Sequence, residues 1–404
     1  MPKRHWFELH NLLFIILFSF QFVWIFSLII SKYGSLVVKK EVGLDYLLYY
    51  SAGYIFRYDS PERLYDLTLQ KQVQATIVPE KNQEHFYPFN HPPILAPLMG
   101  WVVTDNYLAS YLRWVICLLL FQLIGMGVLM RLMRRVFKWK GKDLFVVILS
   151  GLFFYPAIVA FIRGQDSSFF LLGICLWVLG LMDSDDKVAG LGLAMTLIRP
   201  QIALVLAFLF LFKKRRVLLW FLLWSVILLI YCFLFIGWTG LSGFLNVLIF
   251  SGQGLGFDVE KMATLMGAIL RWFPGVDPSV LHLVGYLGYI LAILFLSILW
   301  AKSTRIGFFQ INIAILCTIL FAPHFHGHDL LILLVPSIGV AYLLNQKNLL
   351  GMKYAALIPL AVSVLLIIGD IGTWIFVVYL VIFALAFLSW RPEGFFRVLH
   401  VHTG

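Results

Sequence analysis

The stretch that decides the fold is residues 217–237, VLLWFLLWSVILLIYCFLFIG, which carries no charge and directly follows Lys213-Lys214-Arg215-Arg216. It has the length of about 20 apolar residues that a helix needs to cross a bilayer. Comparable apolar runs recur along the 404 residues, of which 61% are hydrophobic and 13% charged. Soluble domains carry about 25% charged residues. The composition excludes a soluble enzyme, a nucleic-acid-binding domain and a disordered regulator, and it predicts an all-α polytopic membrane protein.

Apolar runs bounded by charged residues, Gly or Pro predict twelve transmembrane helices. Residues 1–404 are therefore expected to form a single integral membrane domain. Two further apolar segments, 93–103 and 263–273, are too short to cross and are predicted to be re-entrant or interfacial. The predicted spans are 11–31, 106–130, 144–162, 168–182, 187–198, 201–212, 217–237, 278–301, 306–322, 329–344, 350–369 and 372–390.

Charge predicts the side that each connection faces. With a cytoplasmic N-terminus, the cytoplasmic segments hold most of the 31 basic residues but a minority of the 20 acidic ones. This bias follows the rule that Lys and Arg collect on the cytoplasmic side. We expect a multi-pass protein of the cell (plasma or inner) membrane, with both termini cytoplasmic and an extracytoplasmic active site. The connections rich in unusual polar residues all fall outside: 32–92, 163–166, 199–201, 239–262 and 323–329.

The first extracytoplasmic loop, 32–92, is rich in aromatic residues. Apolar side chains at helical spacing over 44–56 predict an interfacial helix that begins at Asp45, just above the bilayer. A group at this level can meet both a lipid-borne donor and an acceptor that comes from the water side. Tyr49 and Tyr50 are expected in the aromatic belt at headgroup level, with stacking on a sugar as the alternative.

Two further polar features stand out. Spans 187–198 and 201–212 are short, so Arg199 between them is expected below the headgroups, where a cation needs a partner such as a lipid phosphate. His324 and His328 stand four residues apart in the densest titratable segment, and they would share a helix face if it is helical. Hydrogen bonding to sugar or phosphate by His328 and Asp329 is favoured there over a metal site and over interfacial packing.

The order of these motifs resembles that of glycosyltransferase family 87, a group of membrane enzymes with the GT-C fold that includes mycobacterial mannosyltransferases of phosphatidylinositol mannoside synthesis. The likeness runs from about residue 43 to residue 336. The chain has Arg199 where the family often has Lys, and His91-Pro92-Pro93 where Tyr-Pro-Pro is frequent. The motifs are Asp45, Tyr49-Tyr50-Ser51-Ala52, Asn90-His91-Pro92-Pro93, Gly164-Gln165, Arg199-Pro200-Gln201, Pro323-His324 and His328-Asp329.

The resemblance implies transfer of one sugar from a polyprenyl-phosphate carrier to a lipid or glycan acceptor, with Asp45 as the catalytic acidic residue. Such a transfer needs a base behind the acceptor hydroxyl and cations beside the leaving phosphate. It requires neither a metal nor another cofactor, and we expect inversion with Asp45 as the base. The alternative for Asp45 is a helix N-cap.

The remaining candidates would bind the donor phosphate or the substrates. Arg163, Arg199 and Lys261 are the candidate phosphate partners, because cations, and arginine above all, pair with phosphate oxygens. The alternatives are snorkelling for the arginines and a solvated loop charge for Lys261. Helix capping is the alternative for Gln165. The full set of binding candidates is Tyr49, Tyr50, Asn90, His91, Arg163, Gln165, Arg199, Gln201, Lys261, His324, His328 and Asp329.

Two other functions stay open at this stage. A flippase or transporter of lipid-linked glycans would share the membrane architecture, although the chain lacks a recognisable internal repeat of the kind expected of transporters. A ligase or polymerase of lipid-linked polysaccharides would share an outer-face site. The residues do not distinguish mannose from a related hexose or pentose. The expected partners are the lipid-linked donor, the acceptor and membrane lipids, and no nucleic acid.

Overall fold

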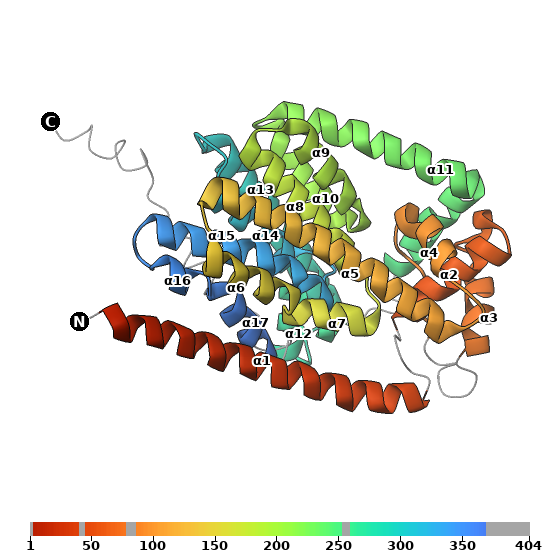
Figure 1. The fold of residues 1–404 in the computed structure, drawn as a ribbon. Coiled ribbons are helices and arrows are strands. Elements are labelled where there is room, and N and C mark those ends of the chain that lie inside the picture. Colours follow the sequence, from red (N-terminus) through yellow and green to blue (C-terminus); the bar gives the residue numbers. More distant parts are fainter. Residues whose placement is uncertain (1–2, 40–44, 78–85, 253–258, 369–404) are drawn as a thin grey trace.

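The computed structural model describes residues 3–39, 45–77, 86–252 and 259–368. Within these ranges the chain is helical and has no strand; the pairing of extended backbone is limited to an isolated antiparallel bridge between Met262 and His326. Figure 1 shows long helices running side by side, with the short helices α2, α3 and α4 gathered at one end. The predicted all-α architecture is confirmed for the described residues.

Six helical segments in the described ranges are long and apolar enough to cross a membrane. Three of them combine two consecutive elements of the chain. The six segments are Leu9–Ser31, Tyr107–Phe137, Gly141–Arg163, Arg215–Ile249, Pro278–Lys302 and Gly327–Gln346. They are formed by α1 (Lys3–Lys39), α5 (Tyr107–Leu132) with the π-helix η3 (Met133–Phe137), α6 (Gly141–Leu152) with α7 (Tyr155–Arg163), α11 (Arg215–Gly252), α13 (Pro278–Lys302), and the 3₁₀-helix η7 (Gly327–Leu333) with α15 (Leu334–Gln346).

The remaining apolar helices are shorter than a full crossing requires, so the predicted count of twelve spans is not reproduced by the described residues. The last predicted span, 372–390, lies outside them. The shorter helices are α8 (Ser167–Asp183), α9 (Asp186–Met195), η4 (Thr196–Ile198), α10 (Pro200–Phe208), η5 (Leu209–Leu211), η6 (Val259–Lys261), α12 (Leu265–Trp272), α14 (Phe308–Phe321), α16 (Met352–Ala355) and α17 (Ile358–Ile368).

The predicted outer connection 239–262 is helical over its first part, because α11 continues to Gly252. The chain turns within this helix at Gly237, where φ is +60°. Glycine adopts that conformation without strain, and a Cβ at this position would lie 3.2 Å from Glu62 Oε1. Beyond the turn the helix packs on η1 (Pro61–Arg63). The first predicted span, 11–31, agrees with the apolar segment Leu9–Ser31, and the helix α1 that contains it extends further, to Lys39.

Helices α6 and α7 are separated by a break around Phe153, and three other helices supply the hydrogen bonds that the break removes. The Gln122 side chain donates to the Gly151 carbonyl at 3.0 Å, and the Gln21 side chain donates to the Phe153 carbonyl. The Tyr155 amide donates to Ser363 Oγ at 2.8 Å. Backbone groups at membrane depth must find partners inside the protein. These side chains therefore stabilise a discontinuous helix whose second half ends at Arg163.

The short helices at one end of Figure 1 are α2 (Tyr46–Tyr58), η1, α3 (Leu67–Ile77), η2 (Pro93–Leu95) and α4 (Ala96–Val102). Helix α2 begins where the sequence predicts, but it is not an exposed interfacial helix. Tyr49 is 1% exposed and Tyr50 is 2% exposed. The belt interpretation of these tyrosines is wrong because α4 packs closely on α2: a Cβ on Gly53 would lie 2.8 Å from the Met99 carbonyl oxygen.

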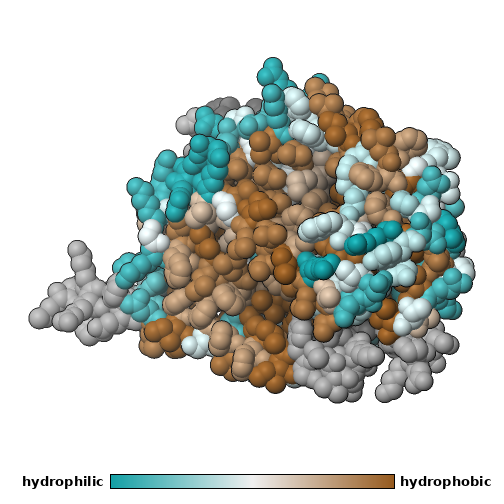
Figure 2. Space-filling model, turned by 45° about the vertical axis from the view of Figure 1, so that its right-hand side comes forward, coloured by the Kyte–Doolittle hydropathy of each residue, from teal (hydrophilic) through white to brown (hydrophobic). Residues whose placement is uncertain are grey.

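Figure 2 shows a broad apolar surface between two groups of hydrophilic residues. Large apolar side chains are exposed along α1, α5, α11 and α13, including Leu234 with 75% of its surface exposed. Water would not favour such a surface, whereas lipid would. The packing therefore agrees with the multi-pass membrane protein that the composition predicts.

Candidate active site

The centre of the site is the guanidinium group of Arg199, which is 5% exposed and lies between two aspartates. Its Nη2 atom donates to Asp166 Oδ1 at 2.7 Å and to Asp329 Oδ1 at 2.9 Å. Ser167 Oγ also donates to Asp329 Oδ1, at 3.0 Å. Three chain segments that are distant in sequence thus meet at one buried cation. Each contributes a charged side chain, and burial of a charge costs free energy unless the charge is paired.

His91 and Tyr49 extend this cluster toward α2. His91 Nδ1 lies 3.0 Å from Arg199 Nη1 and 3.2 Å from Asp166 Oδ2. These contacts are alternatives, because one ring nitrogen either accepts a hydrogen bond or donates one. On the other side of the ring, His91 Nε2 is 3.3 Å from the Tyr49 hydroxyl, which donates to Gln165 Oε1 at 3.1 Å. We call Arg199, Asp166, Asp329 and His91 the Arg199 cluster.

Electrostatics keep the cluster charged despite its burial. Burial alone would raise the pKa of Asp166, but Arg199 and His91 outweigh it and hold that pKa well below its usual range. For Arg199, burial would lower the pKa, while Asp166 and Asp329 raise it well above the ordinary value. Two carboxylates share one guanidinium. A phosphate that approached Arg199 would therefore also meet the negative charge of Asp166 and Asp329.

The segment around His324 is not helical, so the condition under which His324 and His328 would share a helix face is not met. Helix α14 ends at Phe321 and η7 begins only at Gly327. The intervening residues are not helical and are held by neighbours: the Ala263 amide donates to the Phe325 carbonyl at 2.8 Å, and Gln201 Nε2 donates to the His324 carbonyl at 3.1 Å. Proline at 323 disfavours helical backbone in the residue before it, which favours this ending of α14.

The imidazole rings of this segment still gather together. The ring centroids of His324 and His326 are 4.5 Å apart, and those of His326 and His328 are 5.6 Å apart. Burial lowers the pKa of His324 well below its ordinary value, and the neighbouring His326 lowers it further. Burial is also the main cause of the lowered pKa of His326. Both rings are therefore neutral at neutral pH.

Asp45 and Arg163 form a second, more exposed pair. Arg163 Nη1 lies 3.4 Å from Asp45 Oδ2, and the Arg163 side chain is 48% exposed. Asp45 stands at the N-cap position of α2, but its side chain makes no capping hydrogen bond. The N-cap alternative is therefore not what the carboxylate does in this structure. Asp45 is also within electrostatic reach of His326 and His328.

The loop that follows Arg163 is fixed by aromatic side chains of α5. Trp114 Nε1 donates to the Gly164 carbonyl at 2.8 Å, and the Tyr111 hydroxyl donates to the Phe161 carbonyl at 2.9 Å. Gly164 has φ +74°, and a Cβ there would lie 2.7 Å from Tyr46 Cβ. A glycine is required at this point, where the α7 end approaches the start of α2. This approach sets Arg163 beside Asp45.

The structure brings together most of the candidate residues. Asn90 is half-buried and precedes His91 in the chain. The Tyr50 hydroxyl donates to the Thr104 carbonyl at 3.0 Å and not to a member of the Arg199 cluster. Lys261 is exposed next to Met262, which is bridged to His326. The candidate list omits Asp166, Ser167 and His326, although each lies within two residues of a candidate in the sequence. In the described ranges, no group of three or more His, Cys, Asp or Glu side chains is placed to share a metal ion.

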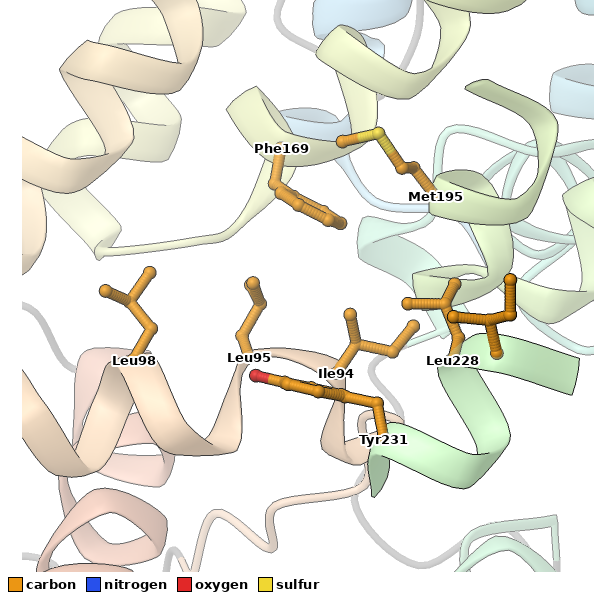
Figure 3. A pocket seen from close by; sticks show the side chains of 8 residues that line it. Ile94, Leu95, Leu98, Phe169, Met195, Leu228 and Tyr231 are labelled. Atoms are coloured by element: carbon orange, nitrogen blue, oxygen red, sulfur yellow. The ribbon is translucent and has the colours of Figure 1, made fainter. Parts of the chain in front are cut away.

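An apolar pocket of about 400 Å³ is lined by residues of the same segments that carry the Arg199 cluster. Figure 3 shows Ile94 and Leu95 on one wall, Phe169 and Met195 opposite, and Leu228 of α11 at the side. Each of the first two walls contains a residue that lies three positions after a member of the Arg199 cluster. Ile94 follows His91, Phe169 follows Asp166, and the Phe169 amide donates to the Asp166 carbonyl at 3.0 Å.

Comparison with protein-family models matches residues 89–323, more than half of the chain, to glycosyltransferase family 87. The chain belongs to glycosyltransferase family 87. The sequence resemblance is thereby confirmed, and membership makes this protein a membrane glycosyltransferase with a sugar donor and an acceptor. A comparison with curated proteins gave no significant match, and a comparison with solved structures gave none either.

The matched range of this family 87 glycosyltransferase includes His91, Arg163, Asp166 and Arg199, but neither Asp45 nor Asp329. Asp45 is joined to the matched range by its contact with Arg163. The tertiary structure thus adds two carboxylates from outside the matched residues, Asp45 beside Arg163 and Asp329 beside Arg199.

Proposed function

We propose that this family 87 glycosyltransferase has a GT-C architecture and moves a sugar, mannose or a related hexose or pentose, from a polyprenyl-phosphate carrier to a lipid or glycan acceptor. The reaction takes place at the extracytoplasmic face, with inversion at the anomeric carbon. The observation that carries the proposal is the Asp45–Arg163 pair: an accessible cation beside a carboxylate that caps nothing, next to neutral histidines.

Asp45 is the general base in this proposal. Its carboxylate accepts the proton from the acceptor hydroxyl while the hydroxyl oxygen attacks the anomeric carbon and the bond to the phosphate oxygen breaks. The phosphate departs with the electron pair. The bond formed and the bond broken lie on opposite faces of the sugar, and inversion follows. Because the Asp45 side chain is 17% exposed, an acceptor from the aqueous side can reach it.

Arg163 is the cation for the departing phosphate. Its pairing with Asp45 is long, at 3.4 Å, and half-exposed, so the pair holds the arginine only weakly. An arginine fork can exchange that contact for two phosphate oxygens. Exposed Lys261, next to the segment that is bridged to His326, adds positive charge on the same side.

Arg199 has a different role in this proposal. A phosphate near its guanidinium would also meet Asp166 and Asp329, which already occupy Nη2. We therefore assign Arg199 to positioning: it holds the start of α8 and the start of η7 against each other, and so places Arg163 near His326. The neutral His324 and His326 rings then donate or accept hydrogen bonds with the sugar hydroxyls.

Purified protein in lipid nanodiscs, supplied with a panel of polyprenyl-phosphate sugars and lipid acceptors, tests the proposal. We expect transfer that Asp45→Asn abolishes without loss of thermal stability. Asp59→Asn is the matched control, because Asp59 lies at the other end of α2 in an exposed pair with Arg63 at 3.2 Å. Translocation of a lipid-linked glycan without transfer would replace the proposal with the flippase alternative. Full activity of Asp45→Asn would show that Asp45 is not the general base.

A further inference from the structure

Helix α2 carries a tyrosine at every fourth residue, and the mechanism proposed above uses none of the four. They are Tyr46, Tyr50, Tyr54 and Tyr58, and residues four apart share one face of a helix. The centroids of successive rings are 6.2, 6.0 and 4.9 Å apart. We call these four residues the tyrosine row. It begins at the residue after Asp45, the proposed base.

The tyrosine row emerges from the protein along its length. Tyr46 and Tyr50 are buried where the start of α5 packs beside α2 (Figure 1), whereas Tyr54 is half-buried and Tyr58 is 45% exposed. In the part of the chain that the structure describes, the hydroxyls of Tyr54 and Tyr58 have no hydrogen-bond partner. The two outer tyrosines therefore offer both a ring and an unused hydroxyl to a molecule that approaches from outside.

Tyr107, the first residue of α5, connects the row to the proposed base. Its ring centroid is 5.6 Å from that of Tyr46 and 5.1 Å from that of Tyr50, and Asp45 is within electrostatic reach of it. At 1.5 Å per helical residue, Tyr58 stands about 20 Å beyond Asp45 along α2. A molecule that extends from Asp45 to the outer end of the row must therefore have several sugar-sized units.

Charges of both signs flank the row. Arg57 Cζ lies 5.2 Å from the centroid of the Tyr58 ring, and the exposed Asp105 is within electrostatic reach of the row. Just beyond the row, Arg63 pairs with Asp59 at 3.2 Å. These charges balance, so they do not select a phosphate. Aromatic faces attract the positively polarised C–H groups of a sugar ring, and the surrounding polar groups can bind its hydroxyls.

We propose that the tyrosine row and Tyr107 bind the sugar units of a glycan acceptor, next to the unit whose hydroxyl reacts at Asp45. The inference rests on the proposed function and narrows its acceptor to a neutral glycan of several units. It gives the exposed tyrosines a role in choosing the acceptor by length. The other possible occupant of this face is the layer of lipid headgroups, where tyrosines also gather.

Saturation-transfer-difference NMR on the full chain in phosphatidylcholine nanodiscs tests the proposal. The probes are neutral tetrasaccharides of mannose, glucose and galactose, each compared with its monosaccharide. We expect at least one tetrasaccharide to bind more tightly than its monosaccharide. Loss of one stacked ring in Tyr54→Ala or Tyr58→Ala should raise its Kd about three- to tenfold. Tyr58→Phe keeps the ring and should bind more tightly than Tyr58→Ala. Tyr286→Ala is the matched control, because Tyr286 is 51% exposed on α13.

Three results would overturn the proposal: no tetrasaccharide that binds better than its monosaccharide; equal binding by the wild type and both alanine variants; or displacement of the tetrasaccharide by glycerol phosphate, which would assign the row to lipid headgroups. The two proposals fail separately. Binding as expected without transfer from any polyprenyl-phosphate sugar would refute the proposed function alone. Transfer that depends on Asp45, with an acceptor KM that Tyr54→Ala and Tyr58→Ala leave unchanged, would refute the role of the row alone.

Discussion

Arg163 and Arg199 each meet aspartate, yet their surroundings differ sharply. The Arg199 side chain is 6% exposed and has carboxylate contacts of 2.7 and 2.9 Å, whereas the Arg163 side chain is 48% exposed and has one contact of 3.4 Å. Removing one partner of a buried pair leaves a stranded charge, while an exposed pair contributes little to stability. We therefore expect Arg199 to matter for folding and Arg163 for catalysis.

The largest effect is expected at Asp45, on the exposed side of this comparison. Asp45→Asn removes the base, and general-base catalysis contributes about 10²–10⁴-fold. Transfer rates measured in nanodiscs should fall by that factor, while the midpoint of thermal unfolding stays near that of the wild type. A variant that unfolds early would show instead that the Asp45–Arg163 pair is structural.

At the buried Arg199 we expect a substitution to act mainly on stability. Arg199→Met leaves Asp166 and Asp329 buried without their shared cation, and such a loss costs about 3–5 kcal/mol. Unfolding followed by tryptophan fluorescence measures it. Arg199→Lys tests the geometry, because one ammonium group cannot reproduce the guanidinium fork. Its stability should lie between that of Arg199→Met and that of the wild type. Wild-type stability of both variants would contradict the positioning role.

Arg163→Met should separate activity from stability at the exposed pair. We expect a loss of about 1 kcal/mol or less in the free energy of unfolding. The transfer rate should fall on the order of 10²-fold, as for loss of one group that stabilises a developing charge. Arg113→Met, at an exposed position of α5, is the control. Equal activity of Arg163→Met and Arg113→Met would show that the departing phosphate does not bind at Arg163.

The smallest effect is a pH dependence of stability. The pKa values of His324 and His326 are lowered by burial, so below about pH 6.5 the unfolded chain takes up protons that the folded chain does not. Stability should therefore fall as the pH drops from 7 toward 5.5. His326→Asn should flatten this slope, and exchange of the exposed His282 should leave it unchanged. A slope of opposite sign would mean that the histidines are charged when folded.

Much of the site could be predicted because its residues are exceptional in their local sequence. Arg199 between two short apolar runs predicts a buried cation with a partner, and it has one. The identity of the partner could not be predicted, since Asp166 and Asp329 approach it only through the packing of α8, α10 and η7. The belt assignment of Tyr49 failed for the same reason: an aromatic residue near the membrane surface looks alike whether or not another helix covers it.

The sequence by itself determined that this chain is a helical membrane protein of glycosyltransferase family 87, because apolar length and ordered motifs are properties of the chain. It also determined where α2 begins and that Asp45 stands there. Only the tertiary structure decided that Arg199 binds two aspartates, that Arg163 faces Asp45, and that α11 bends at Gly237 to cover η1. Such contacts depend on which segments meet in space, and hydropathy along the chain does not record that.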